Sequence, residues 1–207
     1  MSSFSSSSRE KRIFFQAEDK ARRCIDLVMD LPEEVTERIF IEFDAARITR
    51  QAREADEKLQ AFHRELPLHG VTVSFKDMID EQGVVTSAGS AFLRDRAPAC
   101  EDAKIVSQLR AAGAVPFGRT NLSEICYTCL GLNPHFGTPP NVSDPLRIPG
   151  GSSSGAAAVL GLACVMLRLG LIRVGLCVYR RRLTGFMASS QRVRVFRPEA
   201  FRAFSVF

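Results

Sequence analysis

The residues best suited to chemistry lie in a glycine- and serine-rich segment, Pro149–Gly155, which is followed directly by an apolar run. Glycines permit tight turns and close backbone approach, and hydroxyls at the start of a helix lie where free N–H groups favour anionic oxygen. A flexible linker is the simpler interpretation, but linkers do not lead straight into a buried apolar helix. The segment therefore predicts a tight loop that presents serine hydroxyls to a reacting group.

Serine chemistry in this segment needs a base other than histidine. Gly151-x-Ser153-x-Gly155 matches the nucleophile elbow of Ser-His-Asp hydrolases, in which the acid and then the histidine follow the serine. All three histidines come earlier in the chain, so a hydrolase with that chain order is excluded. Lysine is the usual substitute for histidine as the base that activates a serine. The histidines concerned are His63, His69 and His135.

Lys76 is the lysine best placed to act as that base. Val71, Val73 and Phe75 alternate with polar residues, which predicts a strand that ends at Lys76-Asp77. Burial at the end of a strand would hold the amine neutral and basic. The alternative is a lysine whose stem is buried and whose charged end reaches water. The residues alone leave both interpretations open, and the other lysines are Lys11, Lys20, Lys58 and Lys104.

No cofactor or metal site is predicted. Cys126 and Cys129 form a CxxC pair, but no second Cys or His pair has metal-ligand spacing, so two partly buried helical thiols are the better interpretation. Neither a GxxxxGK[ST] nor a GxGxxG motif occurs, which leaves nucleotide binding without support.

The elements that must position Lys76 and the serine loop alternate between strands and helices, which indicates an α/β layered domain. An apolar stripe from Ile41 to Phe62 recurs every three or four residues and predicts a helix. The expected elements are helices over 10–62 with a new start near 30–34, a strand at 71–76, a loop at 82–100, a helix at 102–112, a strand at 115–117, a helix at 120–130, a loop at 131–151 and a helix at 155–166.

Composition is typical of a folded cytoplasmic protein, with 45% hydrophobic and 25% charged residues. The longest apolar run, Gly155–Leu167, is too short to span a membrane, and the N-terminus lacks a signal-peptide pattern. Residues 166–207 hold nine arginines and one acid, whereas residues 1–165 are net acidic. The predicted organisation is a disordered start at 1–9, N-terminal helices at 10–63, a core at 64–165 and a basic tail at 166–207.

Three segments in order resemble the amidase signature family: Leu68–Asp77, residues 86–124 and residues 147–164 (RIPGGSSSGAAAVLGLAC). The resemblance implies an α/β/α sandwich with a mixed central sheet, incomplete in this chain. It also implies a Ser–cis-Ser–Lys triad that hydrolyses small-molecule amides, with no cofactor. By motif position, Lys76 matches the base of that triad and Ser152 matches the cis-serine.

The resemblance stops before the nucleophile. At the family's spacing, the nucleophilic serine falls on Leu176, where the family's GTDTGGSxRxP segment, which also forms the oxyanion hole, is missing. Residues 166–190 can be back-translated and re-read one nucleotide earlier as APFGTDTGGSVRIPAAFDGFYGFK, with the expected serine spanning codons 175 and 176. The residues from about 165 onward are therefore interpreted as the product of a shifted reading frame.

Two functions follow from these observations. The first is an amidase-family hydrolase that is truncated before its nucleophile and is inactive as written. The second is a non-catalytic protein that binds nucleic acid or an anionic membrane through its arginine-rich tail. The second is the less favoured, because residues 166–207 lack the helical period or interleaved aromatic residues of a binding module.

Overall fold

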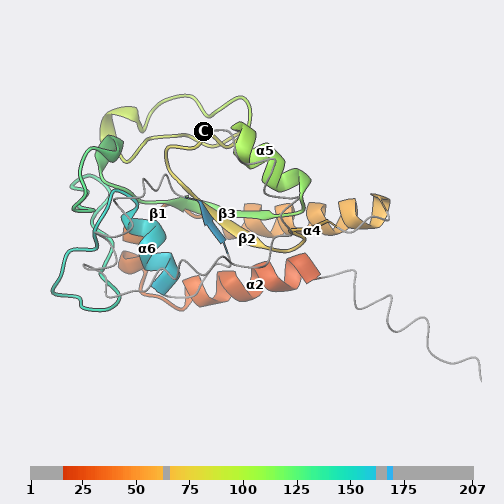
Figure 1. Cartoon of the computed structure of the whole chain (residues 1–207), viewed down its shortest axis with the longest axis horizontal. Coiled ribbons are helices and arrows are strands. Elements are labelled where there is room, and N and C mark those ends of the chain that lie inside the picture. The colour runs from red at the N-terminus through yellow and green to blue at the C-terminus, as the bar shows by residue number, and fades with distance from the viewer. Residues whose placement is uncertain (1–15, 63–65, 162–166, 170–207) are drawn as a thin grey trace, which may run out of the picture.

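A mixed four-stranded sheet lies at the centre of the computed structural model, which describes residues 16–62, 66–161 and 167–169 (Figure 1). Its central strand β2 runs parallel to β3 on one side and to β4 on the other, and β1 is antiparallel to β3. The mixed sheet of the predicted fold is therefore confirmed. In spatial order the strands are β1 (Phe40–Glu42), β3 (Val115–Thr120), β2 (Thr72–Lys76) and β4 (Leu167–Leu169).

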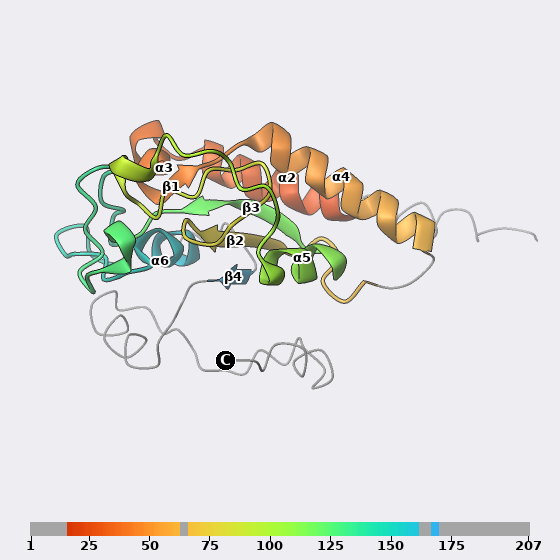
Figure 2. The same cartoon turned by 90° about the horizontal axis from the view of Figure 1, so that it is seen from above.

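Two long helices, α2 (Gln16–Met29) and α4 (Ala45–Phe62), lie side by side over one face of the sheet (Figure 2). Their buried positions recur every three or four residues, so each helix turns one apolar stripe inward. Several of these positions are alanines, which let the two helices approach closely. The core that they form with β3 contains Ala17, Ala21, Ile25, Val28, Ile48, Ala52, Ala55, Val115 and Phe117.

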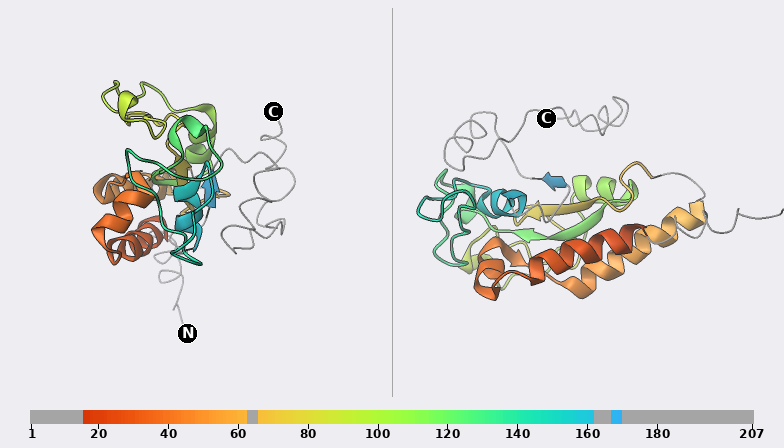
Figure 3. Two further views of the ribbon diagram at one scale, coloured as in Figure 1. Left: turned by 90° about the vertical axis from the view of Figure 1, so that its left-hand side faces the viewer. Right: turned by 90° about the horizontal axis from the view of Figure 1, so that it is seen from below.

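The opposite face of the sheet is covered by α5 (Lys104–Ala111), whose Val106 and Leu109 pack against Val73 and Phe75 of β2. A further short helix, α6 (Ser154–Gly161), contacts α3 (Glu33–Ile39) and the strands β2 and β3. Figure 3 shows the sheet from two further sides, with α2 and α4 together on one flank. This layering brings the start of α6 to the end of β2.

Three local predictions are corrected by the structure. The stripe from Ile41 to Phe62 is not one helix, because residues 40–42 form the edge strand β1 and α4 begins at Ala45. The helix expected at 120–130 is reduced to a single 3-10 turn, Glu124–Cys126. α6 is described as far as Gly161, and the rest of the helix predicted to about residue 166 lies outside the described residues. Lys76 is fully buried, so the interpretation as a lysine that reaches water is wrong.

Three sequence predictions concern residues that are mostly undescribed. The start at 1–9 and the tail beyond residue 169 lie outside the described residues, so the frameshift and the binding role of the tail stay predictions. Along the described ranges, no helix is both long enough and apolar enough to cross a membrane.

Candidate active site

Lys76 is the last residue of β2, a strand whose five residues are all buried. Position 76 carries the only charged side chain of this strand, and it is 0% exposed. Apolar residues earlier in β2 pack into the core, which anchors the strand and fixes the place of the lysine. The fold therefore holds the amine out of bulk water at the carboxyl end of the central strand.

The loop before α6 is held by close backbone contacts that only glycine permits. Gly150 has a φ of +70°, and the following Gly151–Ser152 peptide bond is cis. A Cβ atom on Gly151 would lie 2.6 Å from the Cα atom of Gly131. The Gly151 amide donates a hydrogen bond of 2.7 Å to the carbonyl oxygen of Cys129. The loop is thus locked against the segment around residues 129–131.

Lys76 and Ser152 meet in a direct hydrogen bond. The Nζ atom of Lys76 lies 2.7 Å from the Oγ atom of Ser152, and this contact is buried. The main chain of Ser152 is fixed as well, because its carbonyl oxygen accepts a 2.9 Å hydrogen bond from the Ser123 amide. The two residues that match the family's triad therefore lie in contact, and their catalytic roles stay predictions.

The hydroxyls around Ser152 leave the site polar. The Oγ atoms of Ser123, Ser153 and Ser154 are buried and have no hydrogen-bond partner among the described residues. A buried polar group without a partner costs about 1–3 kcal/mol, so such groups mark places where a further polar group fits. Ser123 and the two serines at the start of α6 therefore leave three hydroxyls near the lysine–serine pair for a further polar group.

A buried ion pair lies directly behind Lys76. Asp77 and Arg119 are both fully buried, with 3.0 Å between the Asp77 Oδ1 and Arg119 Nη2 atoms. The Ser87 hydroxyl donates a 2.6 Å hydrogen bond to the other carboxylate oxygen of Asp77. Burial raises the pKa of the Asp77 carboxyl above its ordinary value. Arg119 and Ser87 lower the pKa, but they offset only part of that rise. The pair links the ends of β2 and β3 beneath the site.

Asn121 is a structural residue that sequence reasoning missed. Its Nδ2 atom donates to the carbonyl oxygens of Arg38 and Gly137, at 2.7 and 2.8 Å. Its own carbonyl oxygen accepts a 2.9 Å hydrogen bond from the Gly155 amide. Asn121 therefore joins α3, the loop near Gly137 and the start of α6. The only sequence signal was an amide residue directly after a buried strand.

We expect Gly155→Ala to destabilise the protein by about 3 kcal/mol, because the added methyl group meets backbone atoms that have no room to move. A Cβ at position 155 would lie 2.4 Å from the Ile39 carbonyl oxygen and 2.5 Å from the Asn121 amide nitrogen. The midpoint of urea unfolding measures the effect. Gly83→Ala is the control: its Cβ would meet no atom within 4 Å, and only its φ of +80° adds a cost, of about 1 kcal/mol. Equal losses for the two variants would contradict the close-packing argument.

The remaining candidate residues do not join this site as ligands. Cys126 is half-buried in the 3-10 turn, whereas Cys129 is exposed and not helical, so the prediction of a helical thiol pair is wrong. Within the described ranges, no group of three His, Cys, Asp or Glu side chains is placed to hold a metal ion. The expected nucleophile position, Leu176, lies outside the described residues.

The mixed sheet with its covering helices, and the three motifs that follow one another along the chain, define an α/β protein with the architecture of amidase-signature enzymes. The profile of the family named Amidase matches residues 30–170, so the chain belongs to the amidase family.

Similar proteins include several with assigned activities. Amidase 1 of Oryza sativa subsp. japonica is 43% identical over 108 residues, covering 52% of this chain and 25% of that protein. Fatty acid amide hydrolase of Arabidopsis thaliana is 32% identical over 151 residues, covering 72% of this chain and 25% of that protein. The structure of peptide amidase from Stenotrophomonas maltophilia superposes with a TM-score of 0.65 at 28% identity, covering 77% and 33% of the two chains. The chain spans about a quarter of the length of these two curated relatives.

Proposed function

We propose that this chain carries the proton-transfer half of a cytoplasmic hydrolase that cleaves C–N bonds in small-molecule amides. The observation that carries the proposal is the buried 2.7 Å hydrogen bond between Lys76 Nζ and Ser152 Oγ. Family membership and relatives named as amide hydrolases support the same chemistry. In this proposal Lys76 is the base and Ser152 is the cis-serine that relays the proton.

The proposed mechanism follows from the arrangement of the two side chains. A neutral Lys76 accepts the hydroxyl proton of Ser152, which in turn accepts the proton of a nucleophilic serine. The serine oxygen bonds to the amide carbon and forms a tetrahedral adduct, whose C–N bond breaks when the relay returns a proton to the leaving amine. Water then attacks the acyl-enzyme with the same relay as base, releasing the carboxylic acid and restoring the serine.

We further propose that the chain as written stops short of this reaction. Leu176 stands at the spacing of the nucleophile, and the GTDTGGSxRxP segment that would supply the oxyanion-hole amides is missing there. Removing one oxyanion donor costs on the order of a hundredfold or more in rate, and here the nucleophile is missing too. A shifted reading frame after about residue 165 accounts for both departures.

A fluorophosphonate probe, which labels activated serines, tests the proposal in two arms. We expect no labelling of the chain as written. We expect stoichiometric labelling after a one-nucleotide correction near codon 166, with the label on the serine that spans codons 175 and 176. Labelling of the uncorrected chain would refute the inactive state. A stop codon soon after the correction would refute the frameshift.

A further inference from the structure

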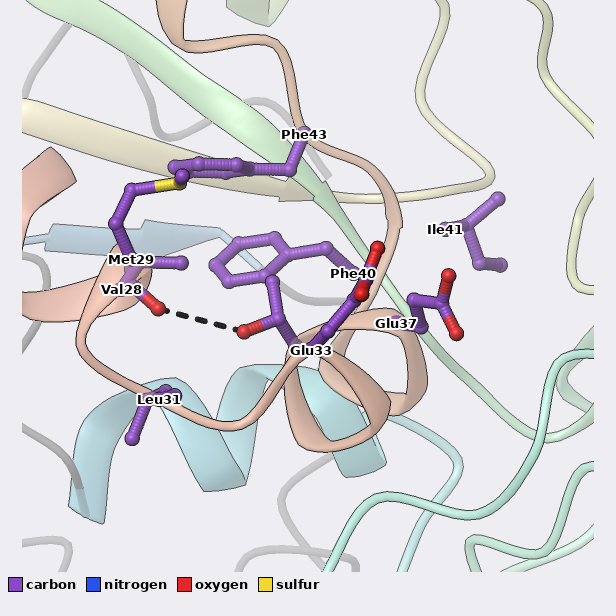
Figure 4. Close-up of a pocket in the computed structure, with 9 residues that line it drawn as sticks. Val28, Met29, Leu31, Glu33, Glu37, Phe40, Ile41 and Phe43 are labelled. Atoms are coloured by element: carbon purple, nitrogen blue, oxygen red, sulfur yellow. Dashed lines mark hydrogen bonds between the residues drawn. The ribbon is translucent and has the colours of Figure 1, made fainter.

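A cavity of about 530 Å³ lies where the end of α2, the helix α3 and the strand β1 meet (Figure 4). Its volume lies within the range of small-molecule sites. Neither Lys76 nor Ser152 lines it, so it is separate from the candidate active site. The lining residues are Val28, Met29, Leu31, Glu33, Thr36, Glu37, Phe40, Ile41 and Phe43.

The cavity is called here the α3 pocket, and its apolar part is built around two aromatic rings. The rings of Phe40 and Phe43 pack with their centroids 5.0 Å apart, and Phe43 also packs on Phe117 in the core, at 5.6 Å. The Thr36 hydroxyl donates to the carbonyl oxygen of Val28 at 3.3 Å, which ties α3 to the end of α2. Met29, which is 66% exposed, completes the apolar lining. An apolar or aromatic group fits such a surface.

The charged part of the α3 pocket is purely acidic. Glu33 and Glu37 are its only charged lining residues, and both are exposed on α3. They stand four residues apart on one face of the helix, where like charges destabilise a helix. Within the described ranges neither carboxylate has an ion-pair partner. Figure 4 shows the two carboxylates on the side of the pocket nearest Phe40.

We propose that the α3 pocket binds a small organic ammonium ion with an aromatic body. The ammonium group neutralises two carboxylates that repel each other, and the ring lies against Phe40, Phe43 and Met29. Aromatic faces also attract cations, which favours an ammonium ion over a neutral group of equal size. A carboxylate ligand is excluded by repulsion from Glu33 and Glu37. This binding does not depend on amide hydrolysis.

Titration calorimetry with phenethylammonium, phenethyl alcohol and hydrocinnamate tests this proposal on the full chain. These probes share one ring and differ in charge. We expect phenethylammonium to bind about tenfold more tightly than the alcohol, and hydrocinnamate not to bind. We expect the preference for the cation to shrink as salt is added, because the carboxylates are exposed. Equal affinity for the cation and the alcohol would overturn the proposal, as would no binding of the cation.

Matched variants separate this site from general surface charge. Glu33→Gln with Glu37→Gln should weaken phenethylammonium binding about tenfold and leave binding of the alcohol unchanged. Glu34→Gln is the control, because Glu34 belongs to the same helical turn as Glu33 but does not line the pocket. Phe43→Leu should weaken the binding of both phenethylammonium and phenethyl alcohol. An equal loss in the Glu34 control would place the effect outside the pocket. A dimer that dissociates when the ligand is added would show that a second copy is the occupant instead.

Discussion

Replacing Lys76 by methionine in the frame-corrected protein is expected to lower kcat/KM for amide hydrolysis by roughly 10²–10⁴-fold, the usual contribution of a positioned base. Methionine keeps much of the length of the side chain and fills the same buried space, so the loss reports on the amine rather than on packing. The Nζ atom of Lys76 already lies within 2.7 Å of the Ser152 hydroxyl, which is the distance that proton transfer requires.

The hydrogen bond between Lys76 and Ser152 leads to a second expectation, which concerns the activities of the single and double variants. If the two side chains pass one proton along a relay, removing either breaks the whole path. Ser152→Ala should therefore cost nearly as much as Lys76→Met, and the double variant should be hardly worse than either single variant. Independent roles would instead give losses that multiply.

Steady-state kinetics on an aryl amide measures these losses, and circular dichroism checks that each variant folds. Lys58→Met serves as the control, because Lys58 is exposed on α4 and far along the chain from the strand that holds Lys76. Full activity of the Lys76→Met variant would remove Lys76 from the mechanism. Loss of activity in the Lys58 control would point to a general effect of lost charge.

The parts of the fold that could be predicted are those with a strong local pattern. Alternation before Lys76 correctly predicted β2, and the apolar positions at Ile105 and Leu109 correctly predicted α5. The glycines at 150 and 151 correctly predicted a tight loop, because their backbone geometry excludes other residues. These features depend on neighbours in the sequence, so one sequence is enough to find them.

The parts that could not be predicted depend on distant contacts. A helix over 120–130 fits the local propensity, but Asn121 is held instead by carbonyls from residues 38 and 137. Ile125 and Cys126 then take left-handed backbone conformations, with φ of +49° and +59°. Ile125 donates its amide to the Ala88 carbonyl oxygen at 2.8 Å, which helps hold that conformation. Tertiary hydrogen bonds therefore override the local preference here.

β1 was missed for a related reason. Ile41 continues the three- and four-residue spacing of α4, so the periodic pattern extends one turn too far. The strand forms because Phe40 pairs with Thr120 and packs its ring against Phe117. A three-residue edge strand carries too few residues for a period of two to be visible.

Arg119→Met is expected to destabilise the protein by about 3–5 kcal/mol, the usual cost of leaving one member of a buried ion pair without its partner. Arg119 and Asp77 are both 0% exposed, so water cannot replace the lost guanidinium. The Ser87 hydroxyl still donates to Asp77 in this variant, but it carries no charge to balance the carboxylate. Urea unfolding at neutral pH measures the loss.

The loss of stability caused by Arg119→Met should depend on pH. The pKa of Asp77 is already raised above its ordinary value by burial, and Arg119 is one of the groups that lower it. Without Arg119 the pKa rises further. A carboxyl with a raised pKa binds its proton more tightly in the folded state, so its contribution to stability falls as pH rises through that pKa. The deficit of Arg119→Met should therefore be largest at neutral pH and should shrink in mild acid.

Two further variants decide whether the cost arises from the unpaired charge. Arg119→Met combined with Asp77→Asn removes both charges, and it should be more stable at neutral pH than Arg119→Met alone, because no buried charge is left without a partner. Arg147→Met removes the exposed pair with Asp144 and should cost less than about 1 kcal/mol. A double variant no more stable than Arg119→Met, together with a deficit that does not change with pH, would assign the loss to packing of the arginine stem instead of to the charge on Asp77.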